Sequence, residues 1–289
     1  MKKQVLITGA NGQLGSSIRK LASKQTGYNF HFTDIDTLDI LSEEQIETFV
    51  TVNQIQYIVN CAAYTAVDKA EENADQALRL NCDALGHIGK VAKAADVKVI
   101  HISTDYVFDG TATRPYREDD PTNPTSVYGS TKLAGEKILQ QICPESVIIR
   151  TAWLYSAYGT NFVKTMMRLG AERSDLNVVF DQIGTPTCAG DLAEAIIAIL
   201  NHSVFTSGIY HYSNEGVCSW YDFANKIMEL SRLNCRIHPI LSKDYPTPVK
   251  RPAYSVLDKS KIKHIYNISI PEWEISLERC ILHPEDKTV

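Results

Sequence analysis

The feature that most constrains the fold is a glycine-rich turn close to the start of the 289-residue chain. The apolar run Val5-Leu6-Ile7 leads into Gly9, Gly12 and Gly15, and an amphipathic segment continues to about Ala22. This order predicts a strand, a tight turn and a helix whose N-terminal N–H groups can approach a pyrophosphate. The Gly-x-x-Gly-x-x-Gly spacing differs from the commonest dinucleotide fingerprint, so a plain glycine-rich turn remains an alternative.

Asp34 follows the short extended segment Phe30-His31-Phe32-Thr33. In dinucleotide-binding folds an acidic side chain at about this distance meets the adenine ribose hydroxyls. A strand-end aspartate that opens a turn is the other interpretation.

Short apolar runs then alternate with longer helical segments, which predicts an α/β fold with a Rossmann-type, doubly wound parallel sheet. The predicted strands lie at 55–59, 97–102 and 147–149, and the predicted helices at 74–95 and 133–142. Residues 42–45, Ser-Glu-Glu-Gln, are typical of a capping box that opens a further helix.

After Arg150 the alternation loosens and a proline-punctuated tail follows. We expect helices at 162–169, 191–200 and 219–230 and a strand at 178–180. The predicted division is a dinucleotide-binding Rossmann domain at 1–153, to which 177–218 returns, and a smaller, interleaved C-terminal substrate-binding lobe at 154–176 and 219–289.

The composition is typical of a globular enzyme and gives no excess of positive charge. The net charge is −5, so neither nucleic acid nor a membrane surface is an expected partner. The seven cysteines are odd in number and include no Cys-x-x-Cys pair, which favours reduced thiols over a disulfide framework or a zinc site. No apolar run suits a signal peptide or a membrane span, and we expect a cytoplasmic protein.

Tyr128 and Lys132 stand four residues apart and would share one face of a helix. A close ammonium stabilises an ionised phenol, so the pair predicts a tyrosine with a lowered pKa that works as an acid near neutral pH. The spacing alone also fits a surface tyrosine beside a solvated lysine.

Three segments directly follow predicted strands, so they would lie at the carboxyl ends of the parallel sheet, where dinucleotide-binding folds have their active sites. They begin at Asn60, Ser103 and Arg150. Thr104 is the natural hydroxyl to hold a carbonyl oxygen beside Tyr128, although Ser103 and Thr104 could instead cap a turn.

Further segments make the pattern specific: Gly9 to Gly15, residues 62–71, the Ser-Thr-Asp-Tyr-Val-Phe-Asp-Gly run at 103–110, Tyr128 to Lys132, and residues 150–155, 161–166, 181–187 and 245–248. Together they resemble the dTDP-4-dehydrorhamnose reductases of the extended short-chain dehydrogenase/reductase superfamily. The resemblance covers almost the whole chain.

This resemblance implies NAD(P)H-dependent reduction of the 4-keto group of dTDP-4-dehydro-β-L-rhamnose to dTDP-β-L-rhamnose, the last step of dTDP-L-rhamnose biosynthesis. Tyr128, Lys132 and Thr104 would be catalytic. The substrate would contact Thr104, Asp105 and Trp153, although Trp153 also fits a core position. Arg251 is a candidate ligand of the substrate diphosphate because a guanidinium forks onto phosphate oxygens, and a solvated surface arginine is the alternative. The implied cofactor-binding residues are Gly9, Gly12, Gln13, Leu14, Gly15, Asp34, Asp39, Ile40, Ala63, Tyr64, Thr65, Tyr128 and Lys132.

The resemblance implies NADPH as the cofactor, with NADH as the alternative because Asp34 would repel a 2′-phosphate. It also makes a homodimer a candidate assembly. Some relatives hold Mg²⁺ through glutamates at a dimer interface, but residues 15–17 and 188–191 lack those acidic ligands here, so we expect no metal site.

Two other functions remain open. A nucleotide-sugar epimerase or 4,6-dehydratase would share the fold and the Tyr/Lys pair, but such dehydratases usually place an acid pair after the threonine, whereas Tyr106 follows Asp105 here. A non-catalytic regulatory subunit resembling that of methionine adenosyltransferase would bind cofactor without turnover.

Overall fold

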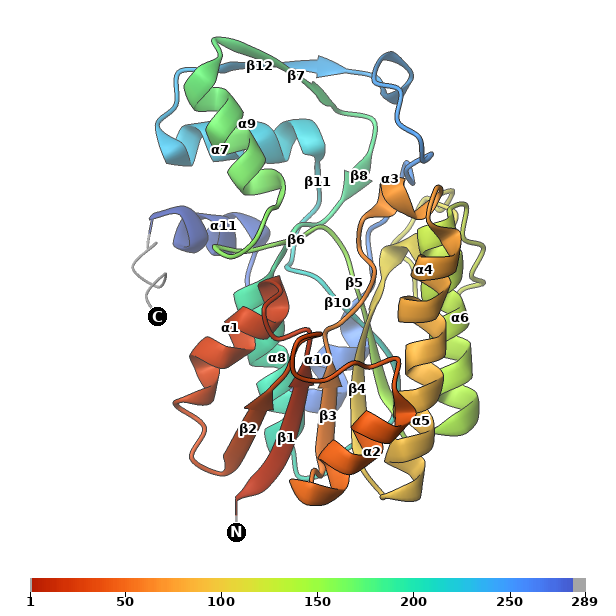
Figure 1. Ribbon diagram of the computed structural model, residues 1–289. Helices are drawn as coiled ribbons and strands as arrows, with labels where there is room; N and C mark the ends of the chain where they lie inside the picture. Colours follow the sequence, from red (N-terminus) through yellow and green to blue (C-terminus); the bar gives the residue numbers. More distant parts are fainter. Residues whose placement is uncertain (1, 283–289) are drawn as a thin grey trace.

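The computed structural model describes residues 2–282, and its centre is a six-stranded parallel sheet in the order β10-β5-β4-β3-β1-β2 (Figure 1). The strands are β1 (Lys3–Thr8), β2 (Tyr28–Phe32), β3 (Tyr57–Asn60), β4 (Lys98–Thr104), β5 (Val147–Thr151) and β10 (Gly208–Tyr212). The chain runs from β1 to β2 in one direction and then from β3 outward in the other. The switch point therefore lies between β1 and β3, where such sheets bind ligands.

Apolar side chains fill both faces of the inner strands. In β1, Val5 and Ile7 belong to one buried cluster, and Leu6 belongs to a second cluster on the opposite face. A strand covered on both sides needs apolar residues at every position, which explains the unbroken run in the sequence.

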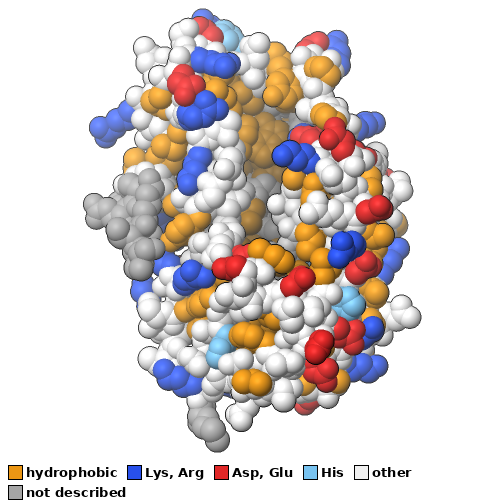
Figure 2. Space-filling model, in the orientation of Figure 1, with side chains coloured by type: hydrophobic (Ala, Val, Ile, Leu, Met, Phe, Trp, Pro, Cys, Tyr) orange, Lys and Arg blue, Asp and Glu red, His pale blue; other side chains and the backbone are white. Residues whose placement is uncertain are grey.

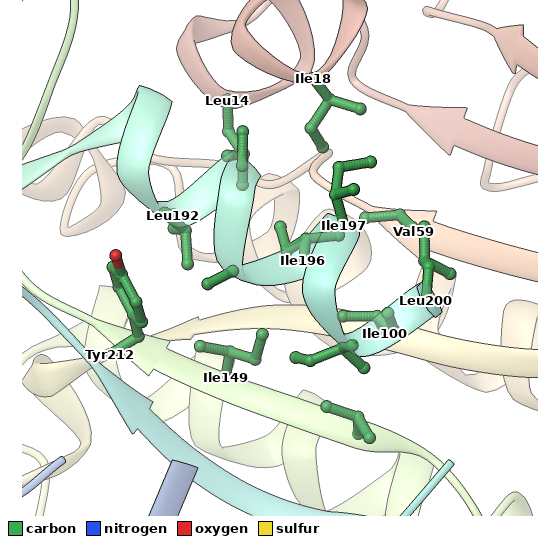
Figure 3. Packing of buried hydrophobic residues seen from close by; sticks show 14 of the residues in the cluster. Leu14, Ile18, Val59, Ile100, Ile149, Leu192, Ile196, Ile197, Leu200 and Tyr212 are labelled. Carbon is green, nitrogen blue, oxygen red and sulfur yellow. The ribbon is translucent and has the colours of Figure 1, made fainter. Parts of the chain in front are cut away.

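Helices cover both faces, as predicted for a doubly wound sheet. One face carries α1 (Gln13–Ala22), α8 (Ala189–Asn201) and α10 (Ser260–Tyr266), and the other carries α2 (Glu43–Val52), α5 (Ala84–Ala94) and α6 (Val127–Ile142). Figure 3 shows Ile196 of α8 between Leu14 and Ile18 of α1 and the strand side chains below.

The predicted helix over 74–95 is interrupted. It forms α4 (Ala74–Leu78), a π-helical turn η1 (Arg79–Asp83) and then α5, and a short α3 (Val67–Ala70) precedes it. Asn81 in this turn bonds the backbone of Tyr64 on both sides, through Tyr64 N to Oδ1 at 2.9 Å and Nδ2 to Tyr64 O at 3.2 Å. Its carbonyl lies so close to Gly135 of α6 that a Cβ there would meet it at 1.9 Å.

The start of α2 matches half of the predicted capping box. Ser42 Oγ accepts a hydrogen bond from Gln45 N at 3.3 Å. The Gln45 side chain does not return to Ser42, because it accepts instead from Asp39 N at 3.1 Å.

A smaller unit lies beside the carboxyl ends of the sheet (Figure 1). It contains α7 (Phe162–Glu172), α9 (Trp220–Ser231), α11 (Trp273–Leu282) and the paired strands β7 (Asp175–Val179) and β12 (Arg236–Ile240), around one apolar cluster. Two more short pairs, β6 (Leu154–Tyr155) with β9 (Thr187–Cys188) and β8 (Ile183–Gly184) with β11 (Cys218–Ser219), connect it to the chain from the sheet.

Two segments differ from the predicted boundaries. Residues 177–179, expected to return to the sheet, pair with β12 in the smaller unit because alternate side chains Leu176 and Val178 enter its apolar cluster. Ser260–Tyr266, expected in the smaller unit, packs through Ile262 and Tyr266 against the sheet cluster. The periodicity of each segment shows that it has an apolar face but not which cluster that face joins.

Within the described residues, no helix is both long and apolar enough to cross a membrane.

A buried ion pair fixes α6 to the sheet. Arg150 of β5 donates to Glu136 of α6 through Nε at 2.9 Å and Nη2 at 2.7 Å, and the side chains are only 3% and 1% exposed. Ser103, at the end of β4, also donates to Glu136. The bidentate geometry satisfies both carboxylate oxygens, as a buried charge requires.

Replacing Glu136 by Gln should lower the free energy of unfolding by about 3–5 kcal/mol, because Arg150 would remain buried without its counter-charge. Urea denaturation measures the change. Glu172→Gln is the matched control, since its ion pair with Arg168 is exposed and should contribute little. Equal losses in the two variants would contradict the role given to the buried pair.

Candidate active site

The glycine turn is as tight as its sequence suggests. Gly9 has a φ of +62°, and a Cβ on Gly15 would lie 2.5 Å from the carbonyl oxygen of Gly9. Helix α1 begins after Gly12 with no side-chain cap and no acidic residue in its first turn. Its first N–H groups are therefore left for an anion, which the helix dipole favours.

Asp34 lies beside this turn, at the end of β2. Its Oδ2 accepts from Asn11 N and its Oδ1 from Ile35 N, both at 2.9 Å. The Asn11 side chain in turn accepts from Arg19 Nη2 at 3.4 Å. An acidic and a basic side chain thus share the corner where the ribose of a dinucleotide would lie.

The turn, Asp34 and the Tyr128 region line one continuous cavity of about 910 Å³. It extends between the two units, where Figure 2 shows the surface hollowed and largely hydrophobic. Most of the predicted site residues line it: Gly9, Gly12, Gln13, Leu14, Gly15, Asp34, Ile40, Ala63, Thr65, Thr104, Asp105, Tyr128, Lys132 and Trp153.

Three predicted contacts lie elsewhere. Asp39 turns toward its own loop, where its Oδ1 accepts from Leu41 N at 2.9 Å, and Tyr64 is held by Asn81. These two shape the cavity through their neighbours Ile40, Ala63 and Thr65, which line it. Arg251 lines a second cavity instead.

Tyr128 lies in the first turn of α6, which Ser126 caps by accepting from Gly129 N at 3.1 Å. The phenol is 9% exposed and meets the ring of Tyr106 edge-on at 5.5 Å. Gly129 lets α6 approach this loop, because a Cβ there would lie 2.2 Å from the Tyr106 carbonyl.

The expected lowering of the Tyr128 pKa by Lys132 is wrong. Burial raises the pKa of Tyr128 above its ordinary value, against a smaller lowering by a hydrogen bond with Thr104. Lys132 Nζ donates to the Ile102 carbonyl at 2.7 Å and lies 3.2 Å from His101 Nε2. Burial lowers the pKa of Lys132 to about 8, although Glu136 opposes the change. Tyr128 is therefore a neutral phenol, the protonation state of an acid.

Asp105 follows Thr104 into the short 3-10 turn η2 (Asp105–Val107) and is almost fully buried. Thr104 Oγ1 donates to Asp105 Oδ1 at 3.0 Å, whereas Asp105 Oδ2 has no hydrogen-bond partner within the described chain. Burial raises the Asp105 pKa to about 6, and hydrogen bonds from Ser255 and Thr104 oppose it. An unpartnered buried oxygen in a cavity suits a polar ligand group.

Trp153 and Arg251 each contact a residue that lines the other of two cavities, the second of which has a volume of about 340 Å³. Trp153 stacks on Trp220 at 3.6 Å between ring centroids, so it packs against the smaller unit while it lines the first cavity. Arg251 donates to Tyr106 Oη at 3.2 Å and to Asp68 Oδ2 at 2.8 Å. Trp153 is therefore both a packing residue and a cavity residue, and Arg251 is a hydrogen-bonded cavity residue rather than a solvated surface arginine.

Several lining residues have no signal in the sequence. The loop at Gly159 and Thr160 lines the cavity beside the glycine turn. Gln13 holds it there, since its Oε1 accepts from Ser156 Oγ at 3.0 Å and from Asn161 Nδ2 at 2.9 Å. The only sequence indication of this loop is the neighbouring segment 161–166, which is part of the family resemblance. His101, which lies beside Lys132 but does not line the cavity, is another residue that sequence reasoning missed.

The chain matches the family model described as RmlD substrate binding domain over residues 1–285. The dTDP-4-dehydrorhamnose reductase of Aggregatibacter actinomycetemcomitans is 38% identical, over 98% of this chain and 99% of that protein. Two solved structures superpose with a TM-score of 0.93. They are the dTDP-4-dehydrorhamnose reductase of Clostridium acetobutylicum (40% identity, 98% and 99% coverage) and that of Bacillus anthracis in complex with NADP (37% identity, 98% and 100% coverage).

Asp105→Asn should stabilise the protein more at high pH than at low pH. The Asp105 carboxyl has a pKa of about 6 in the folded protein and an ordinary value of 3.8. The free energy of unfolding of the wild type therefore falls as pH rises from about 4 to above 6, whereas an asparagine has no proton to lose. The stability difference between variant and wild type should be about 2.4 kcal/mol larger at pH 8 than at pH 4.

Urea denaturation at the two pH values measures this difference. Asp244→Asn, at an exposed position, is the control and should show no such pH dependence. A constant gap for Asp105→Asn would show that burial does not destabilise the ionised carboxylate.

Proposed function

This chain belongs to the RmlD substrate binding domain family, and from that membership we propose that it reduces the 4-keto group of dTDP-4-dehydro-β-L-rhamnose to give dTDP-β-L-rhamnose. The resemblance to dTDP-4-dehydrorhamnose reductases that the sequence predicted is confirmed by relatives that match almost its full length. The chain is an NAD(P)H-dependent oxidoreductase, and the reaction would complete dTDP-L-rhamnose biosynthesis.

One observation carries the assignment of this reaction to residues. Thr104, Tyr128 and Lys132 line the same cavity as the glycine turn, so a hydride donor and a proton donor can act on one carbonyl. A cofactor-binding fold alone would not require a neutral, buried phenol in that position.

The residues at the turn fit a dinucleotide. The uncapped N-terminus of α1 suits the pyrophosphate, and Gly12 leaves open space, since a Cβ there would meet only the Gly9 carbonyl, at 3.3 Å. We assign the cofactor to the lining residues Gly9, Gly12, Gln13, Leu14, Gly15, Asp34, Ile40, Ala63, Thr65, Tyr128 and Lys132.

NADPH is the cofactor we assign, in keeping with the NADP complex of the Bacillus anthracis reductase, and NADH is the alternative. Asp34 disfavours a 2′-phosphate, but its carboxylate is occupied by two backbone N–H groups and Arg19 lies at the same corner. The two charges would then act in opposite directions on the choice between the cofactors.

The bound nicotinamide supplies the hydride for the carbonyl carbon at sugar C4. Tyr128 donates its phenolic proton to the oxygen, so negative charge does not accumulate there. Thr104 Oγ1 would turn its hydrogen from Asp105 Oδ1 to the same oxygen and set its direction. Lys132, in its ammonium form, stabilises the phenolate that Tyr128 becomes, because a nearby cation favours an ionised phenol.

Asp105, Trp153 and Arg251 suit the remainder of the substrate. Asp105 Oδ2 can accept from a sugar hydroxyl, which would give this buried oxygen its missing partner. Arg251 lines the second cavity and donates to Tyr106, which lines the first, and its guanidinium can bind diphosphate oxygens in a fork.

The other two functions have less support. The acid pair typical of the dehydratases is absent after Thr104, because Asp105 is followed by Tyr106, which accepts a hydrogen bond from Arg251. The reductases of Aggregatibacter actinomycetemcomitans and Clostridium acetobutylicum match this chain over almost their full length at 38% and 40% identity, which favours turnover over a regulatory role.

Tyr128→Phe should lower kcat by about 10²–10⁴-fold, the usual contribution of a positioned acid, and leave NADPH affinity within about threefold. The readouts are NADPH oxidation with dTDP-4-dehydro-L-rhamnose generated in place, and NADPH binding by fluorescence. Tyr57→Phe, at the start of β3, is the control and should keep wild-type turnover. Near-wild-type turnover in Tyr128→Phe would overturn the role of Tyr128.

Cofactor choice should respond to the two charges at the ribose corner. Asp34→Asn should raise the ratio of kcat/KM for NADPH over NADH by about tenfold, and Arg19→Gln should lower it by a similar factor, equal to about 1.4 kcal/mol each. Asp36→Asn, an exposed neighbour, is the control. A ratio that both variants move in the same direction would contradict this account of the corner.

A further inference from the structure

Four polar side chains form a continuous buried chain beneath the site, and only the last of them lines the cavity. Thr8, Asn60, His101 and Lys132 come from β1, β3, β4 and α6, and each is at most 2% exposed. Thr8 Oγ1 donates to Asn60 Oδ1 at 2.5 Å, and Asn60 Nδ2 lies 3.0 Å from His101 Nδ1. His101 Nε2 then lies 3.2 Å from Lys132 Nζ.

The direction of each hydrogen bond determines which nitrogen of His101 carries the proton. Asn60 Nδ2 can only donate, so His101 Nδ1 accepts and the ring hydrogen lies on Nε2. That N–H faces Lys132 Nζ, and an ammonium there would place donor against donor. The arrangement in the structure therefore matches the neutral amine of Lys132, whose lone pair can accept.

A reversed arrangement matches the ammonium. If the Asn60 amide rotates by half a turn, its Oδ1 accepts from His101 Nδ1–H and its Nδ2 donates to Thr8 Oγ1, a hydroxyl that both donates and accepts. His101 Nε2 then accepts from Lys132. The Ile102 carbonyl accepts from Lys132 in both arrangements, so the lysine need not move.

We propose that His101 is a positioning residue for Lys132 and that its neutral ring exchanges tautomers when Lys132 gains or loses a proton. Asn60, supported by Thr8, would set the balance between the two arrangements. The use of Lys132 in catalysis rests on the proposed function, whereas the coupling itself concerns the ligand-free protein.

Among the groups around Lys132, His101 is the one whose hydrogen bonding changes when Lys132 gains or loses a proton. Glu136, four residues along α6, already binds Arg150 and Ser103. Burial raises the pKa of the Cys61 thiol to about 12, so it stays neutral, and the phenol of Tyr128 is neutral as well. Burial and Lys132 hold the His101 pKa well below its usual value, so its ring changes tautomer rather than charge.

Nitrogen-15 NMR of histidine-labelled, ligand-free protein tests the proposal between pH 6 and pH 10. The His101 resonances, assigned by their loss in His101→Gln, should exchange between the two neutral tautomer patterns with the midpoint at which Lys132 titrates. The Lys132 midpoint comes from carbon-13 labelled lysine. His211 is the internal control, a fully buried histidine whose Nδ1 bonds the Tyr116 carbonyl, and it should keep one tautomer throughout.

Asn60→Asp tests whether the position of the His101 proton controls the titration of Lys132. A carboxylate can only accept, so it fixes the proton on His101 Nδ1, makes Nε2 an acceptor and should raise the Lys132 midpoint by at least about one pH unit, a tenfold change.

A single His101 tautomer across the range while Lys132 titrates would overturn the proposal, as would an unchanged Lys132 midpoint in folded Asn60→Asp. If that variant does not fold, the wild-type titration still decides. Neither readout needs substrate, so failure of the proposed reaction would be seen separately, in turnover alone.

Discussion

The close packing of helix α6 on the sheet is the constraint on which this molecule depends. Gly129 and Gly135 let α6 approach within contact of two backbone carbonyls, those of Tyr106 and Asn81. The buried pair of Glu136 and Arg150 then holds the helix to β5. Because Tyr128 and Lys132 lie on this helix, the same contacts that stabilise the fold also set the position of the proposed acid.

Burial, more than pairing of charges, sets the protonation states in the site. It raises the pKa values of Tyr128 and Asp105 and lowers that of Lys132, so each group moves toward its neutral form. The low dielectric of such a buried site strengthens the electrostatic interactions that a reacting carbonyl would experience. Within the described residues, no cluster of three or more His, Cys, Asp or Glu side chains is arranged to hold a metal ion.

Much of the fold was predictable because it follows from local patterns. The run at Val5 to Ile7 and the glycines after it led directly to β1, the turn and α1. The exchange of β7 and α10 between the two units was not predictable, since it depends on which apolar face finds a partner far away in the sequence.

The site divides in the same way. Tyr128, Thr104 and the glycine turn could be found from spacing, whereas the contacts of Lys132 could not. A four-residue spacing predicts that its ammonium contacts Tyr128, but in the folded chain Lys132 Nζ donates to the Ile102 carbonyl and lies beside the ring of His101. Arg251 was proposed from the chemistry of its guanidinium, and only the structure shows it held by Asp68 and Tyr106.

Transfer of a labelled hydride tests the central claim most directly. The protein would be given NADPH deuterated at nicotinamide C4, on the transferred face, together with dTDP-4-dehydro-L-rhamnose, and the product examined by NMR. The account predicts dTDP-L-rhamnose with deuterium at sugar C4 and none of it lost to water. Oxidation of the cofactor with deuterium at another carbon, or tight NADPH binding with no transfer at all, would contradict it.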